Sequence, residues 1–257
     1  MPREFELRKE ITLDATPEQV WEAIATGQGI DAWFMGVNQV EPREGGRTSM
    51  TIAGHTEEGV ITAWEPPRRF AHRGGSPDDA QFMAFEWLIE GRDDRTCVLR
   101  LVQHGVLGDD WDTEYDALTK GWDMYLHTLA QYLEHFRGRP AVPVMAMHPG
   151  AGDADRVWPV LSAGLGLSGP ATEGDKVRLT PEGLDPIEGV VDWVSPEALG
   201  VRGDDGLYRF IRGYDGTVVA GHHLFAGDVD PGTAERAWQG WLSRLFETSQ
   251  ATRRPTR

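Results

Sequence analysis

The stretch that decides the fold spans residues 115–136 and reads YDALTKGWDMYLHTLAQYLEHF. Charged and polar residues separate its large apolar side chains, which recur at steps of three and four. They are Leu118, Trp122, Tyr125, Leu129, Leu133 and Phe136. This spacing places them on one face of an α-helix. The sequence therefore predicts one long amphipathic helix whose apolar face must be buried by other elements.

The segments before this helix show the period of two that is typical of β-strands. Residues 5–13 alternate in this way, and further strand-like runs follow between residues 37 and 106, separated by turn-forming residues. A short helix is predicted after Thr16, a capping residue followed by Pro17, and a helical turn at 30–34. An antiparallel sheet can cover the long helix only by curving around it. We expect a first α+β domain at residues 1–138.

Residues 139–248 show the same order of elements in a shortened form. The matches are Val20-Trp21 with Val157-Trp158, Glu58-Gly59-Val60 with Glu188-Gly189-Val190, and Gly121-Trp122 with Gly240-Trp241. Their order is preserved and the offset shrinks along the chain, as a shortened duplication requires. Chance similarity of two amphipathic helices is the alternative. The tail at 249–257 lacks apolar periodicity and is predicted to be disordered.

Composition restricts the partners that the chain can have. Lysine and arginine number 25 against 41 aspartate and glutamate, and the net charge of −16 opposes binding to nucleic acid or an anionic membrane. The single cysteine, Cys97, lies in an apolar run and is expected to be a buried thiol. Neither a signal-peptide core nor a membrane-length apolar run is found, so we expect a cytoplasmic protein.

Several motifs occur in a fixed order along the first half. They are Thr16-Pro17-Glu18-Gln19-Val20-Trp21, Gly29-Ile30-Asp31-Ala32-Trp33-Phe34, Gly45-Gly46, Gly59-Val60-Ile61, Glu65-Pro66-Pro67-Arg68-Arg69-Phe70 and Gly121-Trp122-x-x-Tyr125. Together they resemble the branch of the START-like (SRPBCC) superfamily that is named after the activator of heat-shock-protein ATPase. The resemblance covers residues 3–137 and extends in part to 140–247.

The resemblance implies a helix-grip fold, in which a curved antiparallel sheet wraps around a long C-terminal helix and an apolar cavity lies between them. It implies no single activity, because members bind lipids, hormones or polyketides, a minority are enzymes, and the namesake stimulates a chaperone ATPase. The second half departs from the pattern at Gly164-Leu165-Gly166. We expect it to be a degenerate copy with a small cavity or none, which supports the first half.

Large aromatic residues and methionine on the predicted inner elements are the candidates for lining this cavity, because they offer apolar surface with few polar demands. They are Trp33, Phe34, Met50, Trp64, Phe70, Phe85, Trp87, Trp111, Tyr115 and Trp122. Plain core packing is the alternative for each. No cofactor or metal is expected, because His222 and His223 are adjacent on a strand and point to opposite faces.

Three functions remain open. The leading hypothesis is a binding protein for a small hydrophobic or aromatic molecule, with a homodimer as an open alternative to a monomer. The second is an enzyme, such as a cyclase, dehydratase or hydrolase, that uses His72, His104 or Tyr115 as acid or base. The third is a co-chaperone-like interaction module, which would place function on the acidic outer surface.

Overall fold

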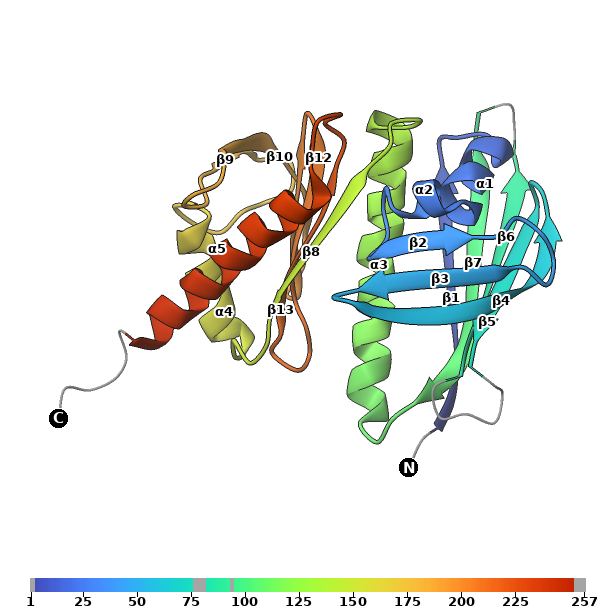
Figure 1. The fold of residues 1–257 in the computed structure, drawn as a ribbon, viewed down its shortest axis with the longest axis horizontal. Helices are drawn as coiled ribbons and strands as arrows, with labels where there is room; N and C mark the ends of the chain where they lie inside the picture. The colour runs from blue at the N-terminus through green and yellow to red at the C-terminus, as the bar shows by residue number, and fades with distance from the viewer. Residues whose placement is uncertain (1–2, 76–81, 93–94, 252–257) are drawn as a thin grey trace. The chain divides into compact units, whose positions relative to one another are not determined.

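The computed structural model describes residues 3–75, 82–92 and 95–251 of the 257-residue chain. The chain divides into two compact units, Met1–Ala141 and Val142–Arg257. Each unit combines one antiparallel sheet with helices, so the fold is α+β, as predicted (Figure 1). No helix in the described part of the chain is both long enough and apolar enough to cross a membrane.

The first unit contains one seven-stranded sheet with the order β1-β7-β6-β5-β4-β3-β2. Its strands are β1 (Arg3–Leu13), β2 (Val37–Val40), β3 (Arg47–Ile52), β4 (His55–Glu65), β5 (Arg69–Gly74), β6 (Met83–Gly91) and β7 (Cys97–Leu107). Its helices are α1 (Pro17–Ala25), α2 (Gly27–Ile30) and α3 (Trp111–His135). Neighbouring strands are antiparallel throughout, so the predicted meander and its long final helix are confirmed.

Local sequence accounts for where the helices of this unit begin. The Thr16 side chain accepts a hydrogen bond from the Gln19 backbone amide, and the Gln19 side chain accepts one from the Thr16 amide, which is a complete capping box before α1. The first turn of α3 carries Asp112 and Glu114, and carboxylates stabilise the positive end of a helix. Along α3, Trp122, Leu129 and Leu133 from the predicted apolar face are buried.

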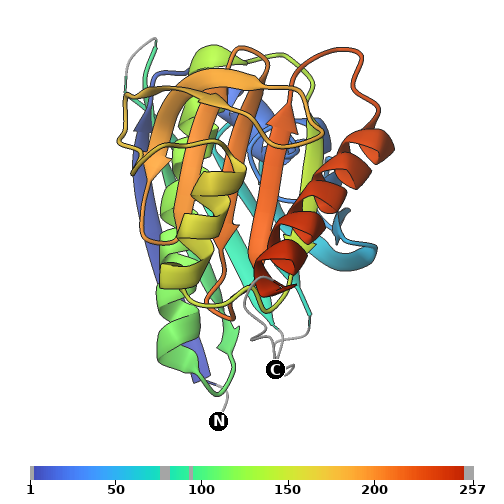
Figure 2. The same ribbon diagram turned by 90° about the vertical axis from the view of Figure 1, so that its left-hand side faces the viewer.

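The second unit has the same winding with one strand and one short helix fewer. Its elements are β8 (Val142–His148), α4 (Ala154–Gly164), β9 (Lys176–Leu179), β10 (Ile187–Val194), β11 (Ala198–Gly203), β12 (Gly206–Arg212), β13 (Val218–Leu224) and α5 (Pro231–Ala251). The sheet order is β8-β13-β12-β11-β10-β9, so the first strand again pairs with the last. Both helices of this unit, α4 and α5, lie on one face of the sheet (Figure 2). The helix-grip fold is therefore present twice.

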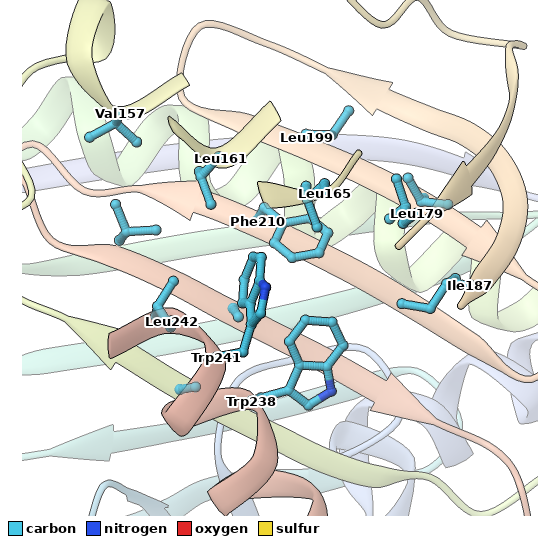
Figure 3. Packing of buried hydrophobic residues seen from close by; sticks show 14 of the residues in the cluster. Val157, Leu161, Leu165, Leu179, Ile187, Leu199, Phe210, Trp238, Trp241 and Leu242 are labelled. Carbon is cyan, nitrogen blue, oxygen red and sulfur yellow. The ribbon is translucent and has the colours of Figure 1, made fainter. Parts of the chain in front are cut away.

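The core of the second unit lies between this face of the sheet and its helices. Trp238 and Trp241 of α5 pack against Phe210 of β12, with ring centroids 6.0 and 6.2 Å apart (Figure 3). Leu161 of α4 is fully buried in the same cluster. The shortened copy has thus kept a complete apolar core of its own.

A shared irregularity identifies equivalent positions in the two sheets. The register between β4 and β5 shifts between Ile61 and Ala63, and the register between β10 and β11 shifts between Val191 and Trp193. The matched Gly59 and Gly189 each lie two residues before the shift. Because a β-bulge inserts one extra residue at one point of a ladder, its recurrence here supports duplication over chance similarity.

The chain ends and the cysteine complete the description. Helix α5 extends to Ala251, so the start of the tail that was predicted to be disordered is helical, and residues 252–257 lie outside the described part. Cys97 is a free, fully buried thiol on β7, and burial raises its pKa to about 11.

Candidate functional site

One row of side chains crosses the sheet of the first unit on the face that carries α3. Cross-strand pairing places its members side by side in the order Leu7, Gln103, Phe85, His72 and Ile61. We call these five residues the inner row. The indole Nε1 of Trp122 on α3 donates a hydrogen bond to Gln103 Oε1 at 2.6 Å, which shows that the row faces the helix.

Aromatic rings fill the region between the inner row and α3. Trp122 stacks on Phe34 at a centroid distance of 5.2 Å and meets Trp87 at 5.5 Å and Phe85 at 6.3 Å. Trp33 extends the group by contacting Trp87 at 6.1 Å. The structure therefore brings five of the nine predicted aromatic candidates into this group.

The same chain of ring contacts continues across β4 and β5. Phe70 lies 5.2 Å from His72 and 5.6 Å from Trp64, and Trp64 meets Trp21 of α1 at 4.9 Å. Sequence reasoning missed Trp21 as a member of this cluster. It also missed Tyr125, whose ring lies 4.8 Å from Phe34.

Exposure separates core members of this cluster from accessible ones. Trp33, Trp87 and Trp122 are at most 5% exposed and pack as ordinary core residues. Phe34, Phe85 and His72 are only half-buried, although they lie on the same inner side. Apolar rings that keep accessible surface beside a packed core are what a ligand site requires.

Glycines occupy much of the sheet row next to the inner row. Pairing places Phe5, Gly105, Met83, Gly74, Gly59 and Thr48 side by side. At Gly74 an added β-carbon would meet only the backbone carbonyl of Glu58, at 3.2 Å, and no side chain. The sheet therefore presents little side-chain bulk directly beside His72, whereas Met83 lies beside Phe85.

His72 is the polar member of this region. Burial lowers its pKa to about 4, so the imidazole is neutral at pH 7. It stacks on Phe85 at 4.9 Å, and its ring nitrogens make no hydrogen bond within the described part of the chain. A neutral imidazole offers one donor and one acceptor, so His72 can orient a bound molecule.

The other proposed acid–base residues lie elsewhere. The side chain of His104 is 49% exposed and faces Glu6, whose Oε2 lies 3.5 Å from its Nδ1, on the side of the sheet opposite to Gln103. Strand alternation puts neighbouring side chains on opposite faces, so His104 does not face the inner row. Tyr115 donates its hydroxyl hydrogen to the Glu6 carbonyl at 3.3 Å.

Three cavity candidates lie apart from the aromatic cluster. Trp111 stacks on Tyr115 at 4.8 Å, and the Arg3 guanidinium covers Trp111 at 4.5 Å from the ring centroid. These residues form a surface group at the first turn of α3. Met50 is half-buried on β3, where a β-carbon on Gly36 would lie 3.1 Å from its Cγ.

An open pocket of about 960 Å³ lies at the start of α1. Its lining residues are Asp14, Ala15, Thr16, Gln19, Arg95, Thr96 and Arg137. Thr16 and Gln19 are already used in the capping box, and Arg137 donates to Gln19 Oε1 at 3.0 Å. Six of the seven lining residues are polar or charged, and none belongs to the predicted apolar site. Within the described residues, no three His, Cys, Asp or Glu side chains converge as metal ligands would.

Comparisons with known proteins bear on the first unit above all. The sequence profile described as Activator of Hsp90 ATPase homolog 1-like protein matches residues 14–134. No curated protein matches the chain. Among solved structures, MLL2253 from Mesorhizobium loti is 21% identical, with 51% of this chain and 98% of that one covered and a TM-score of 0.45.

Two other solved structures match almost the whole chain. The di-domain ARO/CYC BexL from the BE-7585A biosynthetic pathway is 15% identical, with 98% and 100% of the two chains covered and a TM-score of 0.45. DynU16, from the dynemicin biosynthetic locus, is 19% identical, with 97% and 99% covered and a TM-score of 0.44. The profile match covers residues 14–134, so the similarity to the Activator of Hsp90 ATPase homolog 1-like family lies in the first unit.

Proposed function

We propose that the first unit binds a small, uncharged, hydrophobic or aromatic molecule between its sheet and α3. The observation that carries this proposal is the group of half-buried Phe34, Phe85 and His72 beside the glycine-rich row. Planar rings supply stacking surface, and the unpaired imidazole supplies one directional contact. The net charge of −16 makes an uncharged ligand a better match than an anion.

The properties of His72 support binding over acid–base catalysis. With a pKa of about 4, only about one imidazole in a thousand is protonated at pH 7, so His72 is a poor general acid there. It is also a weak base, because efficient general bases have pKa values near the working pH. His104 and Tyr115 lie away from the cluster and cannot replace it.

A titration with the uncharged fluorescent probe N-phenyl-1-naphthylamine tests the proposal. We expect the intact chain to bind it with saturable fluorescence enhancement. Gly74→Leu should weaken binding at least tenfold, because the new side chain would fill the space beside His72 and Phe85. His104→Phe is the matched control on the opposite face and should leave binding unchanged.

Thermal unfolding of both variants guards against a trivial loss of structure. Equal probe binding by wild type and a folded Gly74→Leu variant would contradict the proposed site. So would a parallel loss in His104→Phe, because that change lies on the outer face. Native mass spectrometry of gently purified protein then asks whether a stoichiometric small molecule is retained and released on denaturation.

A further inference from the structure

The second unit contains a row equivalent to the inner row. Pairing places Val144, His222, Tyr208, Val201 and Val191 side by side on the face that carries α5. With the two bulges aligned, His222 takes the place of Gln103 and Tyr208 takes the place of Phe85. A polar side chain therefore lies at the same point of both sheets.

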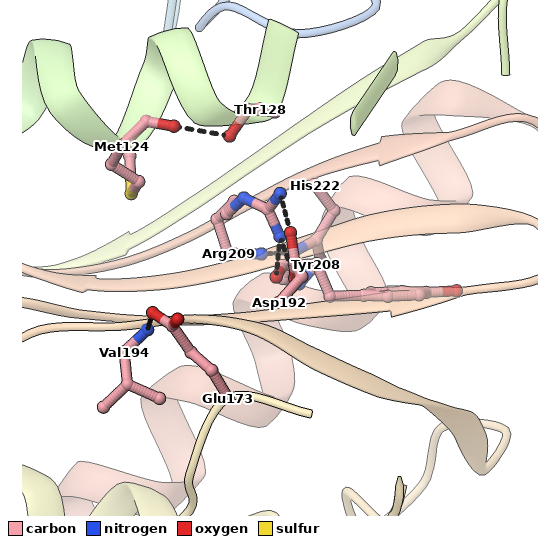
Figure 4. A network of polar contacts seen from close by, with 8 residues as sticks. All are labelled: Met124, Thr128, Glu173, Asp192, Val194, Tyr208, Arg209 and His222. Atoms are coloured by element: carbon pink, nitrogen blue, oxygen red, sulfur yellow. Dashed lines mark hydrogen bonds and ion pairs between the residues drawn. The ribbon is translucent and has the colours of Figure 1, made fainter. Parts of the chain in front are cut away.

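Hydrogen bonding fixes the tautomer of His222. Its Nδ1 accepts a hydrogen bond from the Arg209 backbone amide at 3.2 Å, so Nδ1 carries no proton (Figure 4). Burial lowers the pKa of His222 to about 3, so the ring is neutral and its single proton is on Nε2. His222 is thus a donor at Nε2.

This donor has no hydrogen-bond partner in the described part of the chain. His222 is 1% exposed, and its Nε2 is buried and unpaired. The surrounding rings are apolar: Trp238 lies 4.2 Å away between centroids, and Tyr208 and Phe210 each lie 5.2 Å away. A buried N–H without an acceptor lowers the stability of the folded state, and a ligand that supplies an acceptor would remove this penalty.

The first unit shows that this position can be satisfied internally. There Gln103 accepts from Trp122 Nε1 and also donates from Nε2 to Met83 Sδ at 3.5 Å. In the second unit, Nε2 of His222 is buried without a hydrogen-bond partner in the described residues, and the His222 ring packs against Trp238. At this position the second unit therefore has one buried hydrogen-bond donor, His222 Nε2–H, without an acceptor in the described residues.

Tyr208 is the half-buried member of the ring group around His222. It lies over a glycine row equivalent to that of the first unit, and a β-carbon at Gly206 would come within 2.8 Å of its Cε2. At Gly203 the corresponding distance to the same atom is 3.3 Å. Where it lies over Gly203 and Gly206, the Tyr208 ring contacts backbone rather than side chains. Tyr208 is therefore the accessible ring beside His222.

We propose that the second unit has a binding site of its own, in which His222 Nε2–H donates to an uncharged oxygen of a small aromatic molecule that packs against the half-buried ring of Tyr208. A carbonyl oxygen is the simplest such acceptor. This site is independent of the one proposed for the first unit. It replaces our expectation that the second half only supports the first.

Nuclear magnetic resonance of the full chain, labelled with ¹⁵N in histidine and tryptophan, tests the site with two probes of matched shape. Acetophenone carries an aromatic ring and a carbonyl acceptor, whereas ethylbenzene lacks the acceptor. We expect free His222 to show the Nε2–H tautomer, acetophenone to shift its Nε2 and attached proton saturably, and ethylbenzene to bind roughly tenfold more weakly.

Two variants locate the effect. His222→Phe identifies the resonance and should weaken acetophenone binding roughly tenfold, followed through the Trp238 indole signal, while ethylbenzene binding stays unchanged as evidence of an intact fold. His72→Phe should leave acetophenone binding at His222 unaltered, because it changes only the first unit.

Several results would overturn the proposal. One is a resting Nδ1–H tautomer, and another is equal binding of the two probes. A third is an Nε2 proton that is shifted upfield and unmoved by acetophenone at its solubility limit, because the face of the Trp238 ring would then be its partner. Loss of binding at His222 in His72→Phe would also contradict an independent second site.

Discussion

Removal of the Gln103 amide should destabilise the first unit without affecting the second. Gln103 is 2% exposed and Trp122 is 5% exposed, and the 2.6 Å bond between them joins β7 to α3. Gln103→Leu approximately keeps the side-chain volume but leaves the buried indole N–H without an acceptor. An unsatisfied buried donor costs about 1–3 kcal/mol, so we expect a loss of about 2 kcal/mol.

A double-mutant cycle isolates the hydrogen bond from the change in packing. Trp122→Phe removes the donor and also some buried ring area, so its own cost includes both effects. When both changes are combined, no polar partner is left unpaired, and the double variant should be about 1 kcal/mol more stable than the sum of the single effects predicts.

Hydrogen exchange followed by mass spectrometry suits a chain of two units, because each region reports its own opening free energy. A loss of 2 kcal/mol should accelerate exchange in β7 and α3 roughly thirtyfold, and peptides from β12 and β13 should keep their wild-type rates. Acceleration below about threefold, or strict additivity of the two single variants, would refute a stabilising role for this hydrogen bond.

Three further predictions concern titration, charge and thiol chemistry. Because the pKa of His72 is lowered in the folded state, its neutral form contributes stability that is complete above about pH 6.5 and is lost as pH falls towards 4. In urea unfolding, His72→Phe should remove up to about 3 kcal/mol of this pH dependence of stability. An unchanged pH profile in the variant would contradict the prediction. The Arg209 guanidinium donates hydrogen bonds of 3.0 and 2.7 Å to the Asp192 carboxylate (Figure 4). Asp192→Asn should therefore lower the free energy of unfolding by about 3 kcal/mol in the same assay, and adding Arg209→Met should recover part of that loss. No recovery would argue against a paired charge. Buried Cys97, with its raised pKa, should react with a disulfide reagent at pH 8 only after denaturant is added, and rapid labelling of folded protein would show that it is accessible.

Periodicity and capping predicted the elements that local sequence controls. The apolar steps of three and four residues predicted α3, and the Thr16 cap with Pro17 predicted α1, because both signals act over one or two turns of chain. The match of Gly59 with Gly189 marked equivalent strands, and the structure shows that a bulge follows both glycines.

The facing of strand residues could not be predicted in the same way. His72 and His104 both lie among apolar neighbours in the sequence, yet only His72 shares a row with Phe85 on the inner face. Pairing between distant strands decides this, and a register change of one residue would reverse it. The contacts of Trp111 and Tyr115 could not be predicted for a related reason, because their partners on β1 are remote in sequence.

The sequence did not reveal that Gln103 and His222 are the polar residues of the two inner rows. A polar residue in an apolar strand has no local signature of what it contacts, and the acceptor or donor comes from another element. Adjacent His222 and His223 were considered only as metal ligands, and their opposite orientation gave no hint that Nε2 of His222 has no hydrogen-bond partner in the described part of the chain.

The bulge that recurs in β4 and β10 also indicates the order of two events, the insertion of one residue and the duplication of the unit. One inserted residue, present in an ancestral single-copy gene and inherited by both descendants, explains its matching position without two separate insertions. The differences between Gln103 and His222 and between Phe85 and Tyr208 then arose after duplication. The two units thus share one strand frame, whereas the side chains on its inner face differ, so any molecules that the two units bind should differ as well.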